Sequence, residues 1–289
     1  MQSIREMKLN VGLVQMDCAL GNLGKNIDSV KEHIRNQRGK VDFLIFPELT
    51  LTGYGVGDDF HKYSLRSNDD MFLDLVAETT GITVAVGFIE ETDSFSFYNS
   101  LAIIKDANIL HIHRKVYLPN YGIFEERKHF KPGADYSTFL IDKFRFAPFI
   151  CGDAWSPAFV HLAASDLANV IFISVCSPEK GLGSRLSSKE SWKRLNQFYA
   201  SIYGCYVIFV NRVGAENTLK FWGESEVIDP FGNRLGGFDD DAEGVVVCQL
   251  ALSEVREART IINTIRDEDF NFLNRRLHRV MELSYEWHK

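Results

Sequence analysis

The stretch Phe144-Arg145-Phe146-Ala147-Pro148-Phe149-Ile150-Cys151-Gly152-Asp153-Ala154-Trp155-Ser156-Pro157 carries the pattern that decides the fold. Its first seven residues are mostly apolar without regular alternation, which is typical of a strand that is covered on both faces. Ser156 and Pro157 form a favourable N-cap and first-turn pair for a helix. A buried strand that leads through a tight turn into a helix predicts an α/β fold.

Apolar runs of the same kind recur along the chain and alternate with helix-like segments. The runs cover residues 9–15, 41–46, 82–88, 101–104, 144–150, 170–175, 206–210 and 245–250. The helix-like segments cover residues 22–36, 68–79, 157–167 and 187–204. This alternation predicts layers of sheet and helix in a single domain that spans residues 1–289.

The sequence pattern also predicts which faces of two helices are buried, where a late turn lies and what the C-terminal residues do. The residues expected to face the core are Ile27, Val30 and Ile34 in the first helix-like segment and Met71, Leu73, Leu75 and Val76 in the second. Residues 229–233, Asp-Pro-Phe-Gly-Asn, predict a turn between two late strands. The charged and partly helical residues 253–289 are expected to take part in packing or dimerisation.

Composition narrows the class of protein. The chain has 289 residues, of which 45% are hydrophobic, and a formal net charge of −7. An acidic chain without a basic stripe gives no footprint for nucleic acid or for a membrane surface. No apolar signal core and no run of about 20 apolar residues is present, so we expect a cytoplasmic protein. Five widely spaced cysteines disfavour a disulfide framework or a zinc knuckle, and we expect neither metal nor cofactor.

A glutamate follows one buried strand directly. The segment Phe46-Pro47-Glu48-Leu49 ends the apolar run 41–46. Sites in α/β sheets collect beyond the carboxyl ends of strands, and a carboxylate in apolar surroundings can act as a general base. The alternative is a glutamate that caps a helix or forms a surface ion pair.

A cysteine follows another strand in the same way. Cys151 stands where a strand would turn into a helix, and the Gly152 N–H could help to bind an oxyanion. The nearby helix start would favour the thiolate form of Cys151. Cys176 also follows an apolar run and is the nearest competitor as nucleophile. The tight Gly-Asp turn after Cys151 favours Cys151.

The segment His113-Arg114-Lys115-Val116-Tyr117 holds a lysine that could stabilise a developing negative charge, although a solvated Lys-Arg pair is the alternative. His111 and His113 would share one strand face, but no nearby cluster completes a metal site. No histidine lies in a recognisable Cys–His protease segment. The glycines of residues 53–57 lack the lysine of a nucleotide-binding loop and are expected to form a mobile loop beside Glu48.

Taken together, these three segments resemble the nitrilase, or carbon–nitrogen hydrolase, superfamily. Glu48 in FPELTLTGY, Lys115 in HRKVYLP and Cys151 in FICGDAWSP have that superfamily's order and approximate spacing. The resemblance implies a four-layer α-β-β-α sandwich that often pairs into a homodimer or higher homo-oligomer. It also implies a catalytic Glu-Lys-Cys set and a supporting glutamate, for which Glu126 is the better match and Glu125 the fallback.

The resemblance extends to the expected reaction. It implies a cysteine-dependent hydrolase of non-peptide carbon–nitrogen bonds, acting on an amide or N-carbamoyl small molecule through a thioester and releasing ammonia or an amine. Candidate substrate-binding residues are Tyr54, Trp155, Asn120 and Tyr121, and Arg185 or Arg212 could hold a substrate carboxylate.

Two alternatives remain on the same fold. The segment LPNYGIFEE is similar to the glutaminase domain of glutamine-dependent NAD synthetases and to N-carbamoyl amine hydrolases. The chain could thus be a glutaminase-type subunit that supplies ammonia to a separate synthetase, although Gly152 replaces the glutamate usual there. The sequence contains no SGGxDS segment, which argues against a complete synthetase. The second alternative is a catalytically silent binding module.

Overall fold

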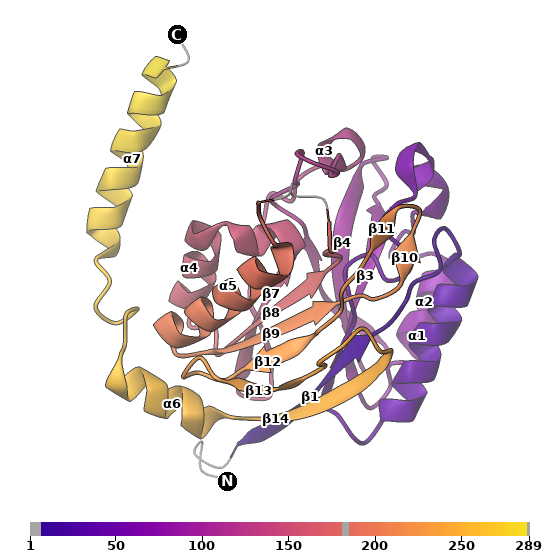
Figure 1. Ribbon diagram of the computed structural model, residues 1–289, viewed down its shortest axis with the longest axis horizontal. Helices are drawn as coiled ribbons and strands as arrows, with labels where there is room; N and C mark the ends of the chain where they lie inside the picture. Colours follow the sequence, from indigo (N-terminus) through magenta and orange to yellow (C-terminus); the bar gives the residue numbers. More distant parts are fainter. Residues whose placement is uncertain (1–6, 181–184, 288–289) are drawn as a thin grey trace.

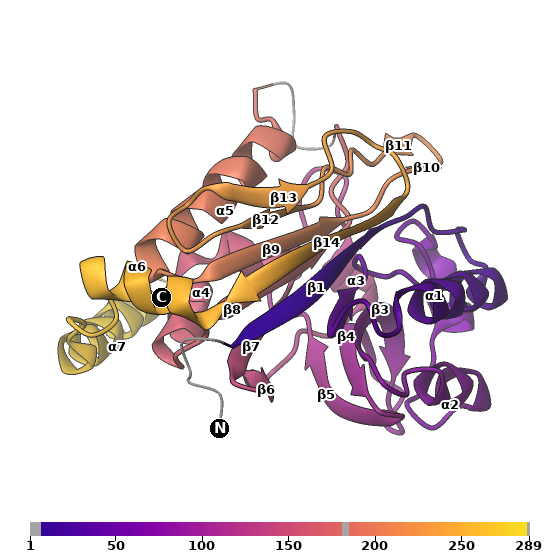
Figure 2. The ribbon, with the colours of Figure 1, turned by 90° about the horizontal axis from the view of Figure 1, so that it is seen from below.

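A computed structural model describes residues 7–180 and 185–287, without the side chains of residues 284–287. Two six-stranded sheets form the centre of the described chain (Figures 1 and 2). The first sheet has the order β14-β1-β2-β3-β4-β5. Its strands are β1 (Lys8–Gln15), β2 (Phe43–Ile45), β3 (Thr83–Glu91), β4 (Phe97–Lys105), β5 (Asn108–Arg114) and β14 (Gly244–Ala251).

The second sheet has the order β13-β12-β9-β8-β7-β6. Its strands are β6 (Phe139–Ile141), β7 (Phe144–Ile150), β8 (Val170–Val175), β9 (Tyr206–Asn211), β12 (Glu226–Ile228) and β13 (Arg234–Gly237). Strands β1, β2 and β3 run parallel, as do β7, β8 and β9. Within each parallel set, the carboxyl ends meet at one edge, where the candidate site lies.

Helices cover the outer face of each sheet. The first sheet packs against α1 (Leu23–Gln37) and α2 (Asp70–Ala77), and the second against α4 (Pro157–Ser165) and α5 (Ser188–Tyr203) (Figure 1). A third apolar cluster fills the space between the sheets, where Phe43 contacts the ring edges of Phe146 and Phe172 at centroid distances of 5.0 and 5.3 Å. The predicted α/β class and four-layer α-β-β-α sandwich are confirmed.

Most predicted elements are present within one to four residues of their expected ends, and β7 and β8 have the expected bounds. The face predicted for α1 is buried as expected. The face predicted for α2 is wrong in part, because Met71 and Leu73 are each 45% exposed while Phe72, Leu75 and Val76 are buried. Residues 72, 75 and 76 have the spacing of one helical stripe, which places residues 71 and 73 on its flanks.

The later part of the chain adds two hairpins and two helices. The predicted turn at residues 229–233 joins β12 to β13, and its Asp229 Oδ1 accepts the N–H groups of Phe231 and Asn233. The short hairpin β10 (Ala215–Glu216) and β11 (Leu219–Lys220) lies apart from both large sheets. No helix in the described ranges is long and apolar enough to cross a bilayer.

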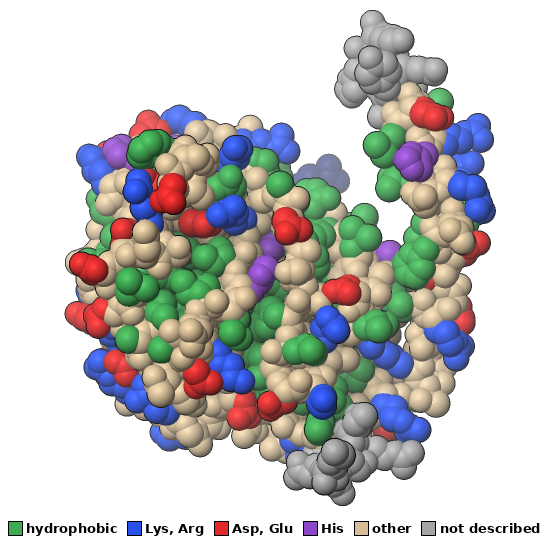
Figure 3. Space-filling view, turned by 180° about the vertical axis from the view of Figure 1, so that it is seen from behind, with side chains coloured by type: hydrophobic (Ala, Val, Ile, Leu, Met, Phe, Trp, Pro, Cys, Tyr) green, Lys and Arg blue, Asp and Glu red, His purple; other side chains and the backbone are tan. Residues whose placement is uncertain are grey.

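Helices α6 (Leu252–Ile261) and α7 (Phe270–Trp287) form the tail. Helix α7 extends away from the sandwich in Figures 1 and 3, and its apolar side chains Phe270, Leu273, Leu277 and Val280 are exposed. The helical character of residues 253–289 is thus present over much of that range. Its role in packing or dimerisation stays a prediction.

Candidate active site

Glu48 lies just beyond β2 and is almost fully buried at 1% exposure. The backbone holds this turn in place, since the Phe46 N–H donates to the Ala85 carbonyl at 2.9 Å and Leu49 adopts a φ of 47°. The side chain has three donors around it. Asn99 Nδ2 donates to Oε1 at 2.8 Å, and the Cys176 N–H donates to Oε2 at 2.9 Å. The third donor is Lys115.

Lys115 follows β5 and is fully buried. Its Nζ donates to Glu48 Oε1 at 2.6 Å and to Glu126 Oε1 at 2.8 Å. Burial by itself lowers the pKa of Lys115, but the charges of Glu126 and Glu48 outweigh it and raise that pKa well above its usual value. Lys115 is therefore a fixed ammonium group at the centre of the site.

Glu126 is the first residue of the short helix α3 (Glu126–His129) and is buried. Its Oε1 also accepts a 2.8 Å hydrogen bond from the Tyr54 hydroxyl. Burial raises the pKa of Glu126 to about 7, against the lowering effect of Lys115 and with a further raising effect from Glu48. The neighbouring Glu125, the fallback assignment, is exposed and makes none of these contacts.

Replacement of Glu126 by glutamine should alter how stability depends on pH. A carboxyl whose pKa is higher in the folded state than in the unfolded state contributes stability below the unfolded pKa of 4.5, and loses it as pH rises through about 7. The wild type should therefore lose up to about 3 kcal/mol relative to Glu126→Gln between pH 4.5 and 8. Urea unfolding at pH 5 and pH 8 measures this difference. Glu125→Gln is the control, and parallel pH curves for wild type and Glu126→Gln would contradict the assignment.

Cys151 begins the tight turn that follows β7, as the sequence predicts. Its φ of 41° places it in the left-handed region, and residues 151–155 form one short 3₁₀ segment before α4. The glycine next to it is required by a close approach, because a Cβ on Gly152 would lie 2.6 Å from the Tyr117 carbonyl oxygen and 3.5 Å from Lys115 Cε. The turn is thus pressed against the segment that carries Lys115.

The electrostatics of the site keep the Cys151 sulfur protonated at rest. Burial and the charge of Glu48 raise the pKa of Cys151 well above its usual value, while Lys115 acts to lower it. The expected thiolate-favouring effect of the helix start is therefore outweighed. A nucleophilic thiolate must form by transfer of the proton to a base beside it.

Two residues missed by the sequence reasoning connect the parts of the site. Asp153 is fully buried, and its Oδ1 accepts the N–H groups of Val116 and Tyr117 at 2.9 and 2.8 Å. Its Oδ2 accepts the Ile150 N–H at 3.1 Å and lies 2.9 Å from His113 Nε2. One carboxylate therefore ties the cysteine turn to the end of β5. Asn99 is the second such residue, since it orients Glu48.

The competitor Cys176 also lies against Glu48, and its backbone contacts the Cys151 sulfur. It is 1% exposed, and its Sγ donates to the Glu48 carbonyl at 2.9 Å. Cys151 lines the pocket described below, whereas Cys176 is absent from its lining. His113 is bound to Asp153, and within residues 7–180 and 185–287 no group of three His, Cys, Asp or Glu side chains is arranged to hold a metal ion.

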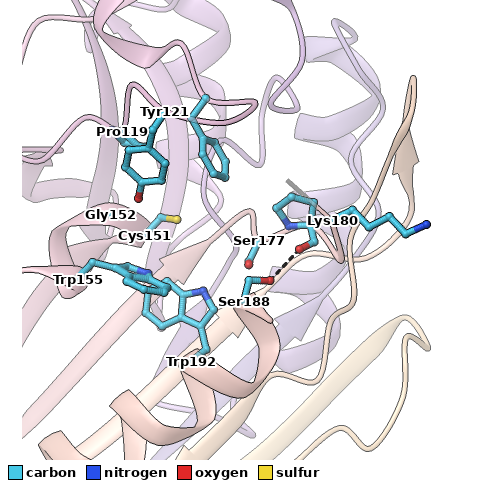
Figure 4. A pocket seen from close by; sticks show the side chains of 11 residues that line it. Pro119, Tyr121, Cys151, Gly152, Trp155, Ser177, Lys180, Ser188 and Trp192 are labelled. Atoms are coloured by element: carbon cyan, nitrogen blue, oxygen red, sulfur yellow. Dashed lines mark hydrogen bonds between the residues drawn. The ribbon is translucent and has the colours of Figure 1, made fainter. Parts of the chain in front are cut away.

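A pocket opens at Cys151 (Figure 4). Its walls are largely aromatic, with Tyr121 and Phe124 on one side and Trp155 edge-on to Trp192 at a centroid distance of 5.4 Å on the other. Tyr121 and Trp155 thus line the pocket, and their part in substrate binding stays a prediction. Asn120 instead lines a neighbouring surface hollow with Tyr117 and Arg127, and Tyr54 lies behind the ion pairs against Glu126.

The idea that Arg212 binds a substrate carboxylate is wrong. Its guanidinium is fully buried and already engaged by Glu216, by Asp17 Oδ1 at 2.8 Å and by the Cys18 carbonyl at 3.1 Å. A side chain with these bonds has no exposed donor to offer a ligand. Arg185 is exposed and does not line the pocket of Cys151.

Comparison with known proteins agrees with this geometry. The family model described as carbon–nitrogen hydrolase matches residues 10–260. The chain belongs to the carbon–nitrogen hydrolase family. The resemblance to the nitrilase superfamily predicted from the three segments is thereby confirmed.

Similar curated proteins differ in how much of their own length the match covers. A glutamine-dependent NAD(+) synthetase of Thermotoga maritima is 32% identical over 256 residues, which cover 86% of this chain and 43% of that protein. A 2-oxoglutaramate amidase of Bacillus subtilis is 28% identical over 270 residues, covering 91% and 99% of the two chains. This carbon–nitrogen hydrolase therefore spans less than half of the synthetase but nearly all of the amidase.

A solved structure supports the fold. A carbon–nitrogen hydrolase superfamily protein from Xanthomonas campestris, which carries an arsenic adduct in its active site, superposes with a TM-score of 0.79. The two proteins are 20% identical, and the match covers 91% of this chain and 98% of that one. At that identity the likeness establishes the sandwich architecture of the present carbon–nitrogen hydrolase.

Proposed function

We propose that this carbon–nitrogen hydrolase is a cysteine-dependent enzyme that cleaves amide or N-carbamoyl bonds of small molecules through a thioester. One observation carries the proposal: Lys115 joins Glu48 and Glu126 in a buried ion-paired group, beside a pocket whose wall includes the Cys151 sulfur. An acid, an ammonium group and a thiol are the groups that covalent acyl transfer requires.

In the first step, Glu48 accepts the proton of the Cys151 thiol as the sulfur attacks the carbonyl carbon. An ionised carboxylate offers about four acceptor positions, and Asn99, Lys115 and Cys176 use three of those on Glu48. One position is left for this proton. The new carbon–sulfur bond pushes the carbonyl electrons onto oxygen, where Lys115 and the Gly152 N–H stabilise the negative charge.

In the second step, the tetrahedral intermediate collapses and the carbon–nitrogen bond breaks. Glu48 gives its proton to the departing nitrogen, which leaves as ammonia or an amine. A water molecule then loses a proton to Glu48 and attacks the thioester carbon. The carbon–sulfur bond breaks, the proton returns to sulfur, and the acid product is released.

The pocket walls favour certain substrates within this class. Among the lining residues that the structure describes, Lys180 is the only charged one, and its side chain points away from Cys151 (Figure 4). A substrate with a distal ammonium group would meet aromatic rings and no carboxylate among these lining residues. Neutral acyl groups fit better, because an unpaired charge of either sign is costly to desolvate.

The similarity to a glutamine-dependent NAD(+) synthetase supports a second candidate within the same chemistry. The match covers 86% of this chain but only 43% of that protein, so the chain corresponds to one part of the longer protein. In this version, the enzyme hydrolyses glutamine and supplies ammonia to a separate synthetase. Glutamine turnover that stays low until a partner is added would distinguish this candidate from a free-standing amidase.

An ammonia-release assay over four compounds tests the proposal. Propionamide is neutral, 2-oxoglutaramate is an anion and L-glutamine is a zwitterion whose ammonium group lies beside its own carboxylate, whereas N-carbamoylputrescine carries a distal ammonium group without a neighbouring carboxylate. We expect at least one of the first three to exceed N-carbamoylputrescine in kcat/KM by about 10-fold or more, the factor that about 1.4 kcal/mol of differential binding gives. Faster turnover of N-carbamoylputrescine would overturn the substrate assignment, and no turnover of any compound would overturn the enzymatic proposal for this panel.

A further inference from the structure

A second buried ion pair lies behind the site and takes no part in the steps above. Arg212 follows β9, and Glu216 belongs to the small hairpin β10–β11. Both side chains are buried, and the guanidinium also stacks over the Phe221 ring at 4.3 Å. Removing two charges from water is expensive, and a buried pair is weak evidence for stability on its own. Stability alone therefore does not explain why Arg212 and Glu216 are paired at this place.

The Glu216 carboxylate binds the loop that carries Tyr54. Its two oxygens accept the Tyr54 N–H at 3.0 and 3.1 Å, and Oε2 accepts the Gly55 N–H at 2.8 Å. The approach depends on Gly53, where an added Cβ would lie 2.5 Å from Glu216 Oε1. The loop expected from sequence to be mobile is thus anchored by a charged acceptor that Arg212 holds from behind.

The anchored loop leads directly to the ion pairs of the site. The Tyr54 hydroxyl donates to Glu126 Oε1 at 2.8 Å, and the same oxygen accepts from Lys115 Nζ at 2.8 Å. Burial and the charges of Glu126 and Glu48 raise the pKa of Tyr54 well above its usual value, so the hydroxyl remains a donor. Arg212 is thus connected to Lys115 through hydrogen bonds at Glu216 and Glu126 and through the covalent structure of Tyr54 between them.

We propose that Glu216 is a positioning residue that keeps the Tyr54 hydroxyl on Glu126 and thereby fixes Lys115 for catalysis. The inference rests on the proposed function, since it assigns Lys115 a part in the reaction. Glu216 is not one of the residues that line the pocket. Its effect therefore reaches the reaction through Tyr54 and should appear in kcat rather than in KM.

The test is a double-mutant cycle between Glu216→Gln and Tyr54→Phe, with kcat and KM measured on the panel amide that turns over fastest. Glutamine places an NH₂ group where carboxylate oxygen accepts from Arg212 and the loop, so the loop is released. We expect Glu216→Gln to lower kcat by about 10- to 100-fold, in keeping with the effect of small misplacements, while KM changes less than about threefold. Tyr54→Phe should lower kcat by a similar factor.

The decisive comparison is the double variant. If Glu216 acts through Tyr54, the double variant should be no slower than the slower single variant, because the Tyr54→Phe substitution leaves no hydroxyl to position. Glu226→Gln is the matched control, since Glu226 is a buried glutamate of β12 bonded to Asn196 and absent from the pocket lining. Its effect on kcat should stay below about twofold in either background, as expected for a site that does not couple to the reaction.

Multiplicative losses in the double variant, or a loss from Glu216→Gln no greater than from Glu226→Gln, would overturn the inference. Should Glu216→Gln fail to give folded protein by circular dichroism, Glu216→Asp keeps the charge but shortens the reach, and the same non-additivity is expected. The Cys151→Ala variant distinguishes failure of the proposed function from failure of the role given to Glu216. An active Cys151→Ala variant would overturn the proposed function, whereas an inactive one combined with multiplicative losses would overturn only the role of Glu216.

Discussion

Replacing Cys151 by alanine is expected to lower the ammonia-release rate by about 10⁴–10⁶-fold, as losses of catalytic nucleophiles do. Alanine removes the only sulfur of the described residues that lines the pocket while it leaves Glu48, Lys115 and Glu126 in place. The fold should tolerate the change, because the side chain is partly exposed at the pocket. Ammonia release and circular dichroism, measured together, separate loss of activity from loss of structure.

Cys176→Ala is the matched control for this variant. The Cys176 Sγ donates to the Glu48 carbonyl, but the contact to the Glu48 carboxylate comes from the Cys176 backbone, which alanine retains. We expect activity within about threefold of wild type and a stability loss of about 1 kcal/mol. Full activity of Cys151→Ala together with an inactive Cys176→Ala would move the nucleophile to the other cysteine.

Replacing Lys115 by methionine should damage activity and stability together. Activity should fall by at least about 10³-fold, because the donor that we propose for the oxyanion is lost. The free energy of unfolding should fall by about 3–5 kcal/mol, since Glu48 and Glu126 would remain buried without their cation. Urea unfolding and the ammonia assay measure the two losses.

The stability loss of Lys115→Met should also depend on pH. Without the ammonium group, the folded-state pKa of Glu126 rises further, so its carboxyl is more readily neutral at low pH. The deficit should therefore be smaller at pH 5 than at pH 8. Lys31→Met is the control, because Lys31 pairs with Asp74, a largely exposed partner, and should cost about 1 kcal/mol or less at either pH. Equal small losses in both variants would contradict the central place given to Lys115.

The main elements of the fold could be predicted because their patterns are local. Strands β7 and β8 are continuous apolar runs with clear ends, and Ser156-Pro157 marks the start of α4. Functional side chains of α/β folds tend to lie beyond the carboxyl ends of strands, and this rule identifies Glu48 and Cys151 as candidates. The α2 face was misjudged since a helix of eight residues holds Met71, Phe72 and Leu73 in sequence, and only the stripe of residues 72, 75 and 76 reaches the sheet.

The supporting contacts could not be predicted from sequence, because they join residues far apart in the chain. Asn99 reaches Glu48 across 51 positions, and Asp153 reaches the end of β5 across 36 and 37. The prediction that Arg212 could bind a substrate carboxylate failed because nothing in its local sequence shows that its side chain is buried. Glu216, four residues later at a helix-like spacing, lies in a hairpin and not in a helix.

Acid quenching during turnover, followed by peptide mass spectrometry, tests the central claim most directly. The claim is that the Cys151 sulfur becomes acylated, with its proton passed to Glu48. We predict that an acyl group of the substrate's mass is found on the peptide that contains Cys151 and on no other peptide. Acylation at Cys176, or steady turnover with Cys151 unmodified at every quench time, would contradict the mechanism.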